Sequence, residues 1–269
     1  GFNFDSETLT AQYGDSVENQ LNGVSTEDSV TYSSNNPTAA RVDRTTGEVT
    51  IVGEGETVIK AIKKNPTPNS PNYRAYYTLT VSKRTAVAGD FTFTPPADLV
   101  YDGSAKTAQV ALDSKYTGCG DIAVKYYDES GKQTEAVNAG TYKVKVDIAE
   151  GENFASVSEL EIGTFTIVAK ELAKGMIANI PAQTYTGSEI RPEVTVTDGN
   201  RPLVKGTDYD VAYSGNTNVG TGSVKVTGKG NYSGEIIKNF VINKADPSYS
   251  VPGDLNATYG DKLSEVALP

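Results

Sequence analysis

Short runs in which apolar and polar residues alternate are the dominant pattern of this chain. In Tyr142–Ile148, four apolar residues fall on one face of an extended strand and three charged residues fall on the other. Shorter runs of the same kind occupy 77–81, 91–94, 194–197 and 224–227. Because turn residues bound each run, the pattern predicts short, half-buried antiparallel strands of the kind found in sandwiches and barrels.

Stretches with helical composition are scarce. The best candidate, Val168–Ile177, contains a glycine and lies between two strand-like runs. Valine, threonine and tyrosine, which suit pleated strands, are frequent, and the 26 glycines and 12 prolines punctuate turns. The chain is therefore predicted to be all-β.

The sequence also repeats itself. Asn138–Val146 is similar to Asn218–Val226. This pair is one of four matched pairs of elements, which occur in the same order in two stretches of the chain. The other matched pairs are 101–104 with 185–188, 151–154 with 230–232, and 165–167 with 240–242. We expect Gly140 and Gly220, which occupy the same place in the two repeats, to adopt backbone angles that other residues avoid.

Charged linkers of a few residues divide the repeats. They predict modules at 2–83, 84–169 and 170–244, arranged as an elongated, semi-rigid array because short linkers limit bending. Ala257–Asp261 is similar to Ala11–Asp15, so 245–269 is predicted to be the truncated start of a fourth module. The chain is accordingly interpreted as a fragment of a longer protein.

Composition excludes several classes of function. The 269 residues carry a net charge of −10, which disfavours a nucleic-acid partner. Histidine is absent, which excludes histidine-dependent triads and most zinc sites. No run of 18 apolar residues occurs, so membrane insertion of this fragment is not expected. The single cysteine, Cys119, cannot form an internal disulfide.

Four consecutive stretches of the first module follow a recognisable pattern: Ser29–Pro37, Ala40–Asp43, Thr46–Thr50 and Gly53–Ala61. Through them the first module resembles a bacterial Ig-like module of group 2. Tyr32 stands where the family usually has tryptophan. The turn at Thr46–Gly47 and the strand starts that follow it agree with that pattern.

Three further steps, Gly206–Tyr213, Asn218–Thr221 and Gly228–Tyr232, follow another known pattern. Through them the second and third modules resemble the related Ig-like and "mostly β" repeats of bacterial surface proteins. The resemblance implies tandem Ig-like β-sandwich modules in an extracellular protein, either attached to the bacterial cell surface or secreted. It implies no enzyme activity, supplies no catalytic residues and calls for no cofactor. The function it implies is a monomeric stalk or spacer that displays a distal domain.

A binding module is the alternative function. The segment 65–77 contains a proline-rich loop followed by tyrosines, and stiff loops with tyrosines often present binding surfaces on sandwich domains. Tyr73, Tyr76, Asn69 and Asn72 are the candidate ligand-binding residues. An adhesin or carbohydrate-binding module of this kind would bind a host or cell-wall glycan or a protein ligand. The same segment is also explained without a ligand, by a loop whose length has drifted without functional consequence and by a Tyr77 that is buried in the core.

Other candidates are weaker. The carboxylate pairs Asp208/Asp210 and Glu150/Glu152 could serve acid–base chemistry, but solvated strand or loop charge explains them too. Cys119, between two glycines, is predicted to lie in an exposed turn and is a candidate reactive thiol. An enzyme fragment is the weakest of the functional hypotheses.

A bound calcium ion and an isopeptide bond are two further structural hypotheses for this chain. A calcium ion could bind where acids crowd the start of the first module, although no EF-hand spacing is present, and no metal site is predicted. A lysine–asparagine isopeptide bond would need partners on adjacent strands. The candidate residues for such a bond are Lys170, Lys174, Lys238, Asn239 and Asn243.

Overall fold

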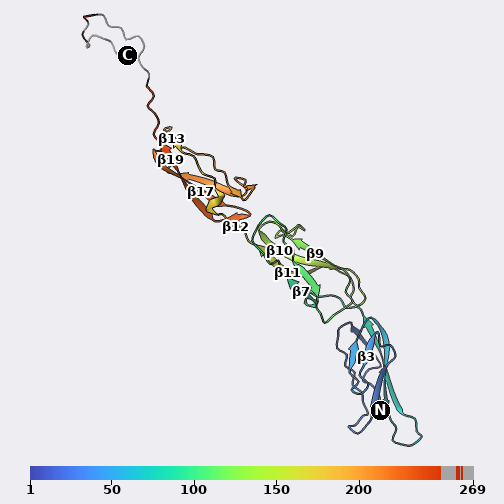
Figure 1. The fold of residues 1–269 in the computed structure, drawn as a ribbon. Coiled ribbons are helices and arrows are strands. Elements are labelled where there is room, and N and C mark those ends of the chain that lie inside the picture. The colour runs from blue at the N-terminus through green and yellow to red at the C-terminus, as the bar shows by residue number, and fades with distance from the viewer. Residues whose placement is uncertain (250–258, 261, 263–269) are drawn as a thin grey trace. The chain divides into compact units, whose positions relative to one another are not determined.

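The computed structural model describes residues 1–249, 259, 260 and 262, and it divides into two compact units, Gly1–Ala169 and Lys170–Pro269. The regular structure of the described residues consists of β-strands and two single 3-10 turns (Figure 1). The chain is therefore all-β, as predicted. The predicted fourth module, 245–269, falls mainly outside the described residues. The weak helix candidate at 168–177 forms a two-residue strand and one of the 3-10 turns.

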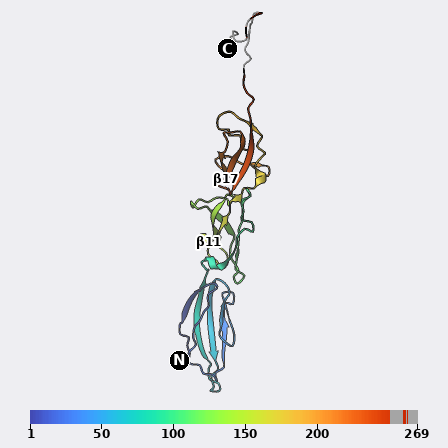
Figure 2. The ribbon, with the colours of Figure 1, turned by 90° about the vertical axis from the view of Figure 1, so that its left-hand side faces the viewer.

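Unit 1 begins with a two-layer sandwich, which we call module 1 (residues 2–83). Its strands are β1 (Thr8–Gln12), β2 (Val30–Ser34), β3 (Ala40–Val42), β4 (Val49–Ile51), β5 (Gly55–Lys63) and β6 (Tyr73–Ser82). The main sheet has the order β1-β6-β5-β2, in which β1 runs parallel to β6 (Figure 2). The β3–β4 hairpin and the bridge between Phe4 and Leu21 form the second layer.

Alternating apolar residues of the long strands build the core of module 1. Residues 75, 77, 79 and 81 of β6 are buried, whereas their neighbours on the strand point outward. Tyr77 lies against Phe4 with ring centroids 4.7 Å apart, and burial raises the pKa of Tyr77 to about 12. The predicted turn at Thr46–Gly47 is present, and Gly47 has a φ of 80°.

The second half of unit 1, module 2 (84–169), repeats this plan. Its elements are η1 (Ala88–Asp90), β7 (Phe91–Thr94), β8 (Gln109–Leu112), β9 (Ile122–Tyr127), β10 (Gly140–Ile148) and β11 (Val157–Ile167). The sheet has the order β11-β10-β9, and Val100 forms a parallel bridge to Val168 beside β11. The antiparallel pair β7–β8 belongs to a separate two-stranded sheet.

Unit 2 contains module 3 (170–244). Its elements are β12 (Lys170–Glu171), η2 (Lys174–Met176), β13 (Gln183–Thr184), β14 (Thr197–Asp198), β15 (Arg201–Pro202), β16 (Tyr209–Ser214), β17 (Gly220–Gly228), β18 (Tyr232–Ser233) and β19 (Glu235–Asn243). The main sheet has the order β13-β19-β17-β16, with β13 parallel to β19. Phe240, Val224 and Ile242 lie in its core.

The same tyrosine hydrogen bond recurs at one end of every main sheet. The backbone N–H groups of Tyr13, Tyr101 and Tyr185 donate to the carbonyls of Ser82, Val168 and Asn243, at 3.0, 2.9 and 2.9 Å. Tyr101 and Tyr185 come from the matched sequence elements, so the repeat in sequence is also a repeat in backbone pairing. The module boundaries themselves stay a prediction.

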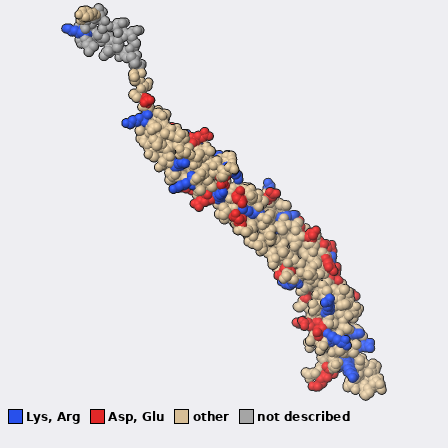
Figure 3. Space-filling model, in the orientation of Figure 1, with Lys and Arg blue, Asp and Glu red and all other residues tan. Residues whose placement is uncertain are grey.

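Charged side chains of both signs mix on the molecular face shown in Figure 3. On the face shown in Figure 3, lysine and arginine are interspersed with aspartate and glutamate over both units. Many charged residues of the protein form ion pairs, such as Lys225 with Glu235 at 2.8 Å and Lys145 with Glu159 at 3.2 Å. Such exposed pairs contribute little to stability individually.

Gly220 should not tolerate a β-branched residue. Its φ is 131°, and that of the matched Gly140 is 146°, which confirms that both adopt angles L-residues rarely take. No atom lies within 4 Å of a Cβ placed on Gly220, so the expected cost of Gly220→Val, about 1–3 kcal/mol, comes from the backbone alone. Urea unfolding of unit 2 measures it. Gly175 is the control, because a Cβ there also meets no atom within 4 Å but its φ is not positive. Gly175→Ala should leave the free energy of unfolding unchanged. Equal losses for the two substitutions would show that the backbone angle of Gly220 is not the cause.

Candidate functional site

The linker between modules 1 and 2 is very short. β6 ends at Ser82, and Arg84 already forms a parallel bridge to Phe154 in module 2. The N–H of Arg84 donates to the carbonyl of Asn153 at 2.9 Å, and the carbonyl of Arg84 accepts the N–H of Ala155 at 3.0 Å. Lys83 alone separates the two paired segments, so the linker leaves little freedom for the modules to rotate.

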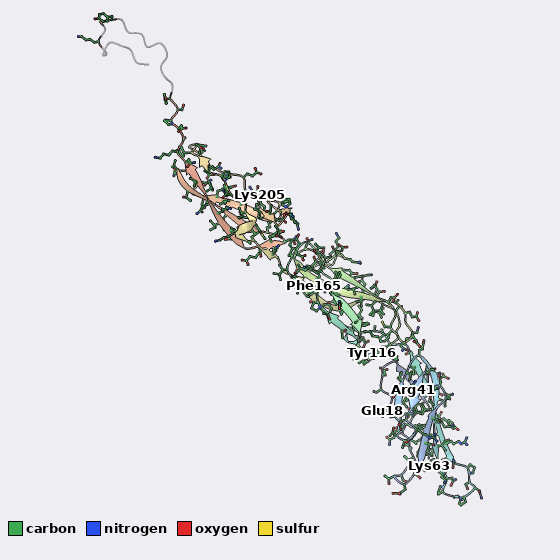
Figure 4. The ribbon with its side chains drawn as sticks, in the orientation of Figure 1. Glu18, Arg41, Lys63, Tyr116, Phe165 and Lys205 are labelled. Carbon is green, nitrogen blue, oxygen red and sulfur yellow. The ribbon has the colours of Figure 1, made fainter. Side chains whose placement is uncertain are left out.

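Three aromatic rings fill the contact between the modules. Tyr13 of module 1 meets Phe154 edge-on at 5.9 Å and Tyr116 at 6.1 Å, and Tyr116 meets Phe154 at 5.8 Å. Phe154 is fully buried and Tyr13 is only 7% exposed. Ile51 of module 1 packs on the same cluster. The two modules therefore share a hydrophobic core, which we call the Tyr13 joint; Figure 4 labels Tyr116 within it.

Hydrogen bonds orient the rings. The Tyr13 hydroxyl lies 3.2 Å from the Thr117 Oγ1 and accepts the Thr117 N–H at 3.1 Å. The side chain of Asn153 donates to the Thr117 carbonyl at 3.3 Å. A Cβ on Gly14 would lie 2.6 Å from the Tyr116 ring, so glycine is required for this approach.

A buried ion pair fixes the start of module 2. Arg84 donates from Nε and Nη2 to the two carboxylate oxygens of Asp90, at 2.9 and 2.7 Å. Asp90 is 2% exposed. Burial alone would raise the pKa of Asp90, but the hydrogen bonds from Arg84 and from the Val87 N–H outweigh it and hold that pKa below its usual value. The Arg84 guanidinium also lies 4.9 Å from the centre of the Tyr116 ring.

Further ion pairs cross the joint at its rim. Arg84 lies 3.8 Å from the Asp15 carboxylate of module 1. Lys83 pairs with Glu150 of module 2 and lies 3.9 Å from Glu54 of module 1. Hydrogen bonding to Lys83 lowers the pKa of Glu150. These contacts connect both modules to the linker itself.

The four candidate ligand residues do not form one constellation. Asn69 and Asn72 lie in the loop before β6, where Asn72 accepts the N–H of Asn65 at 3.1 Å. Tyr73 and Tyr76 are 46% and 47% exposed, but they point to opposite faces of β6 because three positions separate them. Tyr73 packs against Phe2, and both rings lie beneath the ammonium of Lys63.

Cys119 is half-buried rather than exposed. It packs against the core cluster that contains Phe154, and burial raises the pKa of its thiol. The neighbouring glycines permit close backbone approach: a Cβ on Gly120 would lie 2.4 Å from the Ala149 carbonyl oxygen. The prediction of an exposed turn was therefore wrong. The glycines beside Cys119 are required by close packing and do not mark a solvent-exposed loop.

We expect Cys119 to react slowly in the native protein. The raised pKa lowers the fraction of thiolate, which is the form that attacks an alkylating reagent, and partial burial limits the access of the reagent to the sulfur. Iodoacetamide labelling at pH 7.5, followed by mass spectrometry, should be at least tenfold slower for folded protein than for protein unfolded in urea. Equal rates would show that the thiol is as accessible and as readily ionised as in the unfolded chain, and would contradict this expectation.

Four of the remaining candidates, Asp208, Asp210, Lys170 and Lys238, have structural partners. Asp208 accepts the Val204 N–H at 2.8 Å, while Asp210 lies 3.4 Å from Lys229, so the two carboxylates serve different contacts. Lys170 pairs with Asp198 at 2.7 Å, and Lys238 donates to the Ile177 carbonyl at 3.0 Å.

The described residues contain neither a cluster of metal ligands nor a membrane-spanning helix. Within them, histidine, cysteine, aspartate and glutamate side chains form no group of three or more that could hold a metal ion. The described part of the chain also contains no helix long and apolar enough to cross a membrane.

Comparison with known proteins identifies the first module. Residues 6–71 match the family model of the bacterial Ig-like domain (group 2), which confirms the resemblance seen in that part of the sequence. The family assignment of modules 2 and 3 stays a prediction. No curated protein matches the chain.

Solved structures with tandem β-domains align over most of the chain at low similarity. Mouse Cadherin-23 EC22-24 is 11% identical, with a TM-score of 0.23, over 91% of this chain and 96% of that one. Dpr2 Ig1-Ig2 in complex with DIP-Theta Ig1-Ig3 is 10% identical, with a TM-score of 0.26, over 90% and 99%. The human Desmocollin-1 ectodomain is 9% identical, with a TM-score of 0.23, over 91% and 61%.

Proposed function

We propose that this chain is a non-catalytic spacer segment of a bacterial cell-surface or secreted protein. In this role it holds a distal domain at a fixed orientation. The observation that carries the proposal is the Tyr13 joint, in which a shared aromatic core, a one-residue linker and ion pairs connect modules 1 and 2. A spacer needs such joints because a flexible connection would let the displayed domain collapse toward the surface.

The family match supports this role. Residues 6–71 match a bacterial Ig-like domain, and sandwich domains of this kind are stable scaffolds without an intrinsic reactive centre. Several side chains singled out as candidates for chemistry, among them Asp208, Asp210 and Glu150, have structural partners instead. The best-defined polar network, around Arg84 and Asp90, lies at a module contact rather than in an open cleft.

Surface display tests the spacer role. The chain would connect an epitope tag to a bacterial surface anchor, and antibody binding to the tag would be measured. The same tag displayed on a Gly/Ser linker with the same number of residues is the comparison. A spacer should present the tag better than the flexible linker. Tyr13→Ala should reduce tag binding, whereas Tyr185→Ala, at the matching backbone position of module 3, should not. If the flexible linker performs as well, the spacer proposal is wrong.

A second candidate is a binding module in the 65–77 region, favoured by the exposure of Tyr76. Binding of the chain to a glycan array and to immobilised mucin tests it. Binding that Tyr76→Ala abolishes would support an adhesin or carbohydrate-binding role. An array and a mucin surface without signal would contradict a glycan-binding role for this region.

A further inference from the structure

Part of the edge of β6 has no strand beside it. β5 pairs with all of β6 from Tyr73 to Val81, but β1 covers the other side only from Thr78 to Ser82. The Thr78 N–H donates to the Glu7 carbonyl at 2.9 Å. Because backbone groups alternate sides along a strand, the N–H and C=O groups of Arg74 and Tyr76 face the same way as those of Thr78.

The N-terminal segment leaves this edge open. Before Glu7 the chain crosses to the other layer, where the Asp5 N–H donates to the Gln20 carbonyl at 2.9 Å. The Ser6 N–H likewise turns away, to the Asn19 side chain at 3.1 Å. Within the described part of the chain, no strand pairs with β6 between Tyr73 and Tyr77 on this side.

A groove of about 540 Å³ lies between this edge and the N-terminal segment. Its walls are Phe2–Asp5 and Glu7 on one side and Arg74–Thr78 on the other. The buried pair Phe4 and Tyr77 gives it apolar surface, and the half-exposed ring of Tyr76 lies at the rim. At about 3.3 Å per residue, the open edge is roughly 13 Å long, which accommodates about four residues of an extended peptide.

We propose that this groove binds an extended, basic peptide segment of a partner protein, which adds a strand to β6 in line with β1. Strand addition is favoured because it would satisfy the backbone groups of Arg74 and Tyr76 and continue an existing ladder. The basic character follows from charge: Asp5 and Glu7 outnumber Arg74 along the groove, and the whole chain carries −10. This inference does not depend on the spacer role.

Peptide titration followed by amide NMR tests the proposal. The probe is a blocked hexapeptide that alternates lysine with valine, added to the full chain up to about 5 mM, a range that detects weak binding. We expect chemical-shift changes centred on Arg74 and Tyr76. Two versions of the probe, N-methylated at odd or at even positions, should differ, because only one set of peptide N–H groups can face β6. The version with glutamate in place of lysine should bind at least fivefold more weakly.

Variants of Tyr76 separate the backbone from the side chain. Tyr76→Pro removes the N–H that faces the groove, at an edge position where proline is tolerated, and should weaken binding at least tenfold. Tyr76→Phe keeps the N–H and should bind within about twofold of the original chain. Should Tyr76→Pro fail to fold, the N-methylated peptides still decide the question. The proposal is overturned if no peptide shifts these amides, if the shifts lie elsewhere, if both N-methylated peptides bind alike, or if the glutamate peptide binds equally well.

Discussion

Phe154→Ala should reduce the free energy of unfolding of unit 1 by about 3–5 kcal/mol, the range measured when a buried phenylalanine is truncated to alanine. Phe154 is fully buried and contacts both Tyr13 and Tyr116, so its removal opens a cavity at the contact of the two modules. Urea unfolding, followed by amide NMR signals from each module, measures the change. We expect signals of modules 1 and 2 to unfold together in the original chain and separately in the variant.

Module 3 offers a matched control for this substitution. Tyr232 occupies the position that corresponds to Phe154, because the parallel pairing of Lys170 with Tyr232 matches that of Arg84 with Phe154. Tyr232 is also buried, so Tyr232→Ala should destabilise unit 2 and leave the unfolding of unit 1 unchanged. A loss below about 1 kcal/mol for Phe154→Ala would mean that the ring is not part of a packed core.

Asp90→Ala should cost about 3 kcal/mol at pH 7, because it leaves the largely buried Arg84 without its bidentate partner. The effect should depend on pH in a defined direction. The folded-state pKa of Asp90 is lowered, so its stabilisation is fully present above the unfolded-state value near about 4 and is lost as pH falls through the folded-state value.

The difference in stability between the original chain and Asp90→Ala should therefore shrink below about pH 4. Urea unfolding of unit 1 at pH 7, 5 and 3 measures it, and the other carboxylates cancel because both proteins contain them. Glu235→Ala serves as a control, since its partner Lys225 is exposed and the pair should contribute nothing measurable. A difference that grows toward acid pH would contradict the assignment of the ion pair.

The sequence predicted those features that depend on neighbouring residues. Alternation in Tyr142–Ile148 placed β10 correctly, because a half-buried strand imposes a period of two on its residues. The order of repeated elements predicted that Gly140 and Gly220 occupy equivalent strained positions, since the same turn demands the same residue. The family pattern in 29–61 similarly predicted the turn at Gly47.

Features that depend on distant pairs were missed. Tyr13 and Thr117 are 104 positions apart, and nothing near Tyr13 indicates that its hydroxyl meets module 2. Asp90 was not singled out at all, because a lone aspartate in a loop is normally solvated. One signal was available: the Tyr-Gly-Asp step at 13–15 recurs at 259–261, and residues repeated at module ends are candidates for joints.

The ligand candidates illustrate a related limit. Tyr73 and Tyr76 are both exposed, but the faces they point to depend on the register of β6 against β5, which the loop composition does not encode. The open edge between Tyr73 and Tyr77 arises because the N-terminal segment changes layers before Glu7. No local pattern predicts such a crossing, so the groove could be found only in three dimensions.

Residual dipolar couplings of backbone amides test the central claim most directly, that the Tyr13 joint holds modules 1 and 2 in one orientation. Couplings from the strands of module 1 and from those of module 2 would be fitted separately in a weakly aligned sample of the full chain. A rigid joint predicts that both sets give the same alignment tensor, in magnitude and direction. Tensors of clearly different magnitude would show that the modules move independently and would contradict the account.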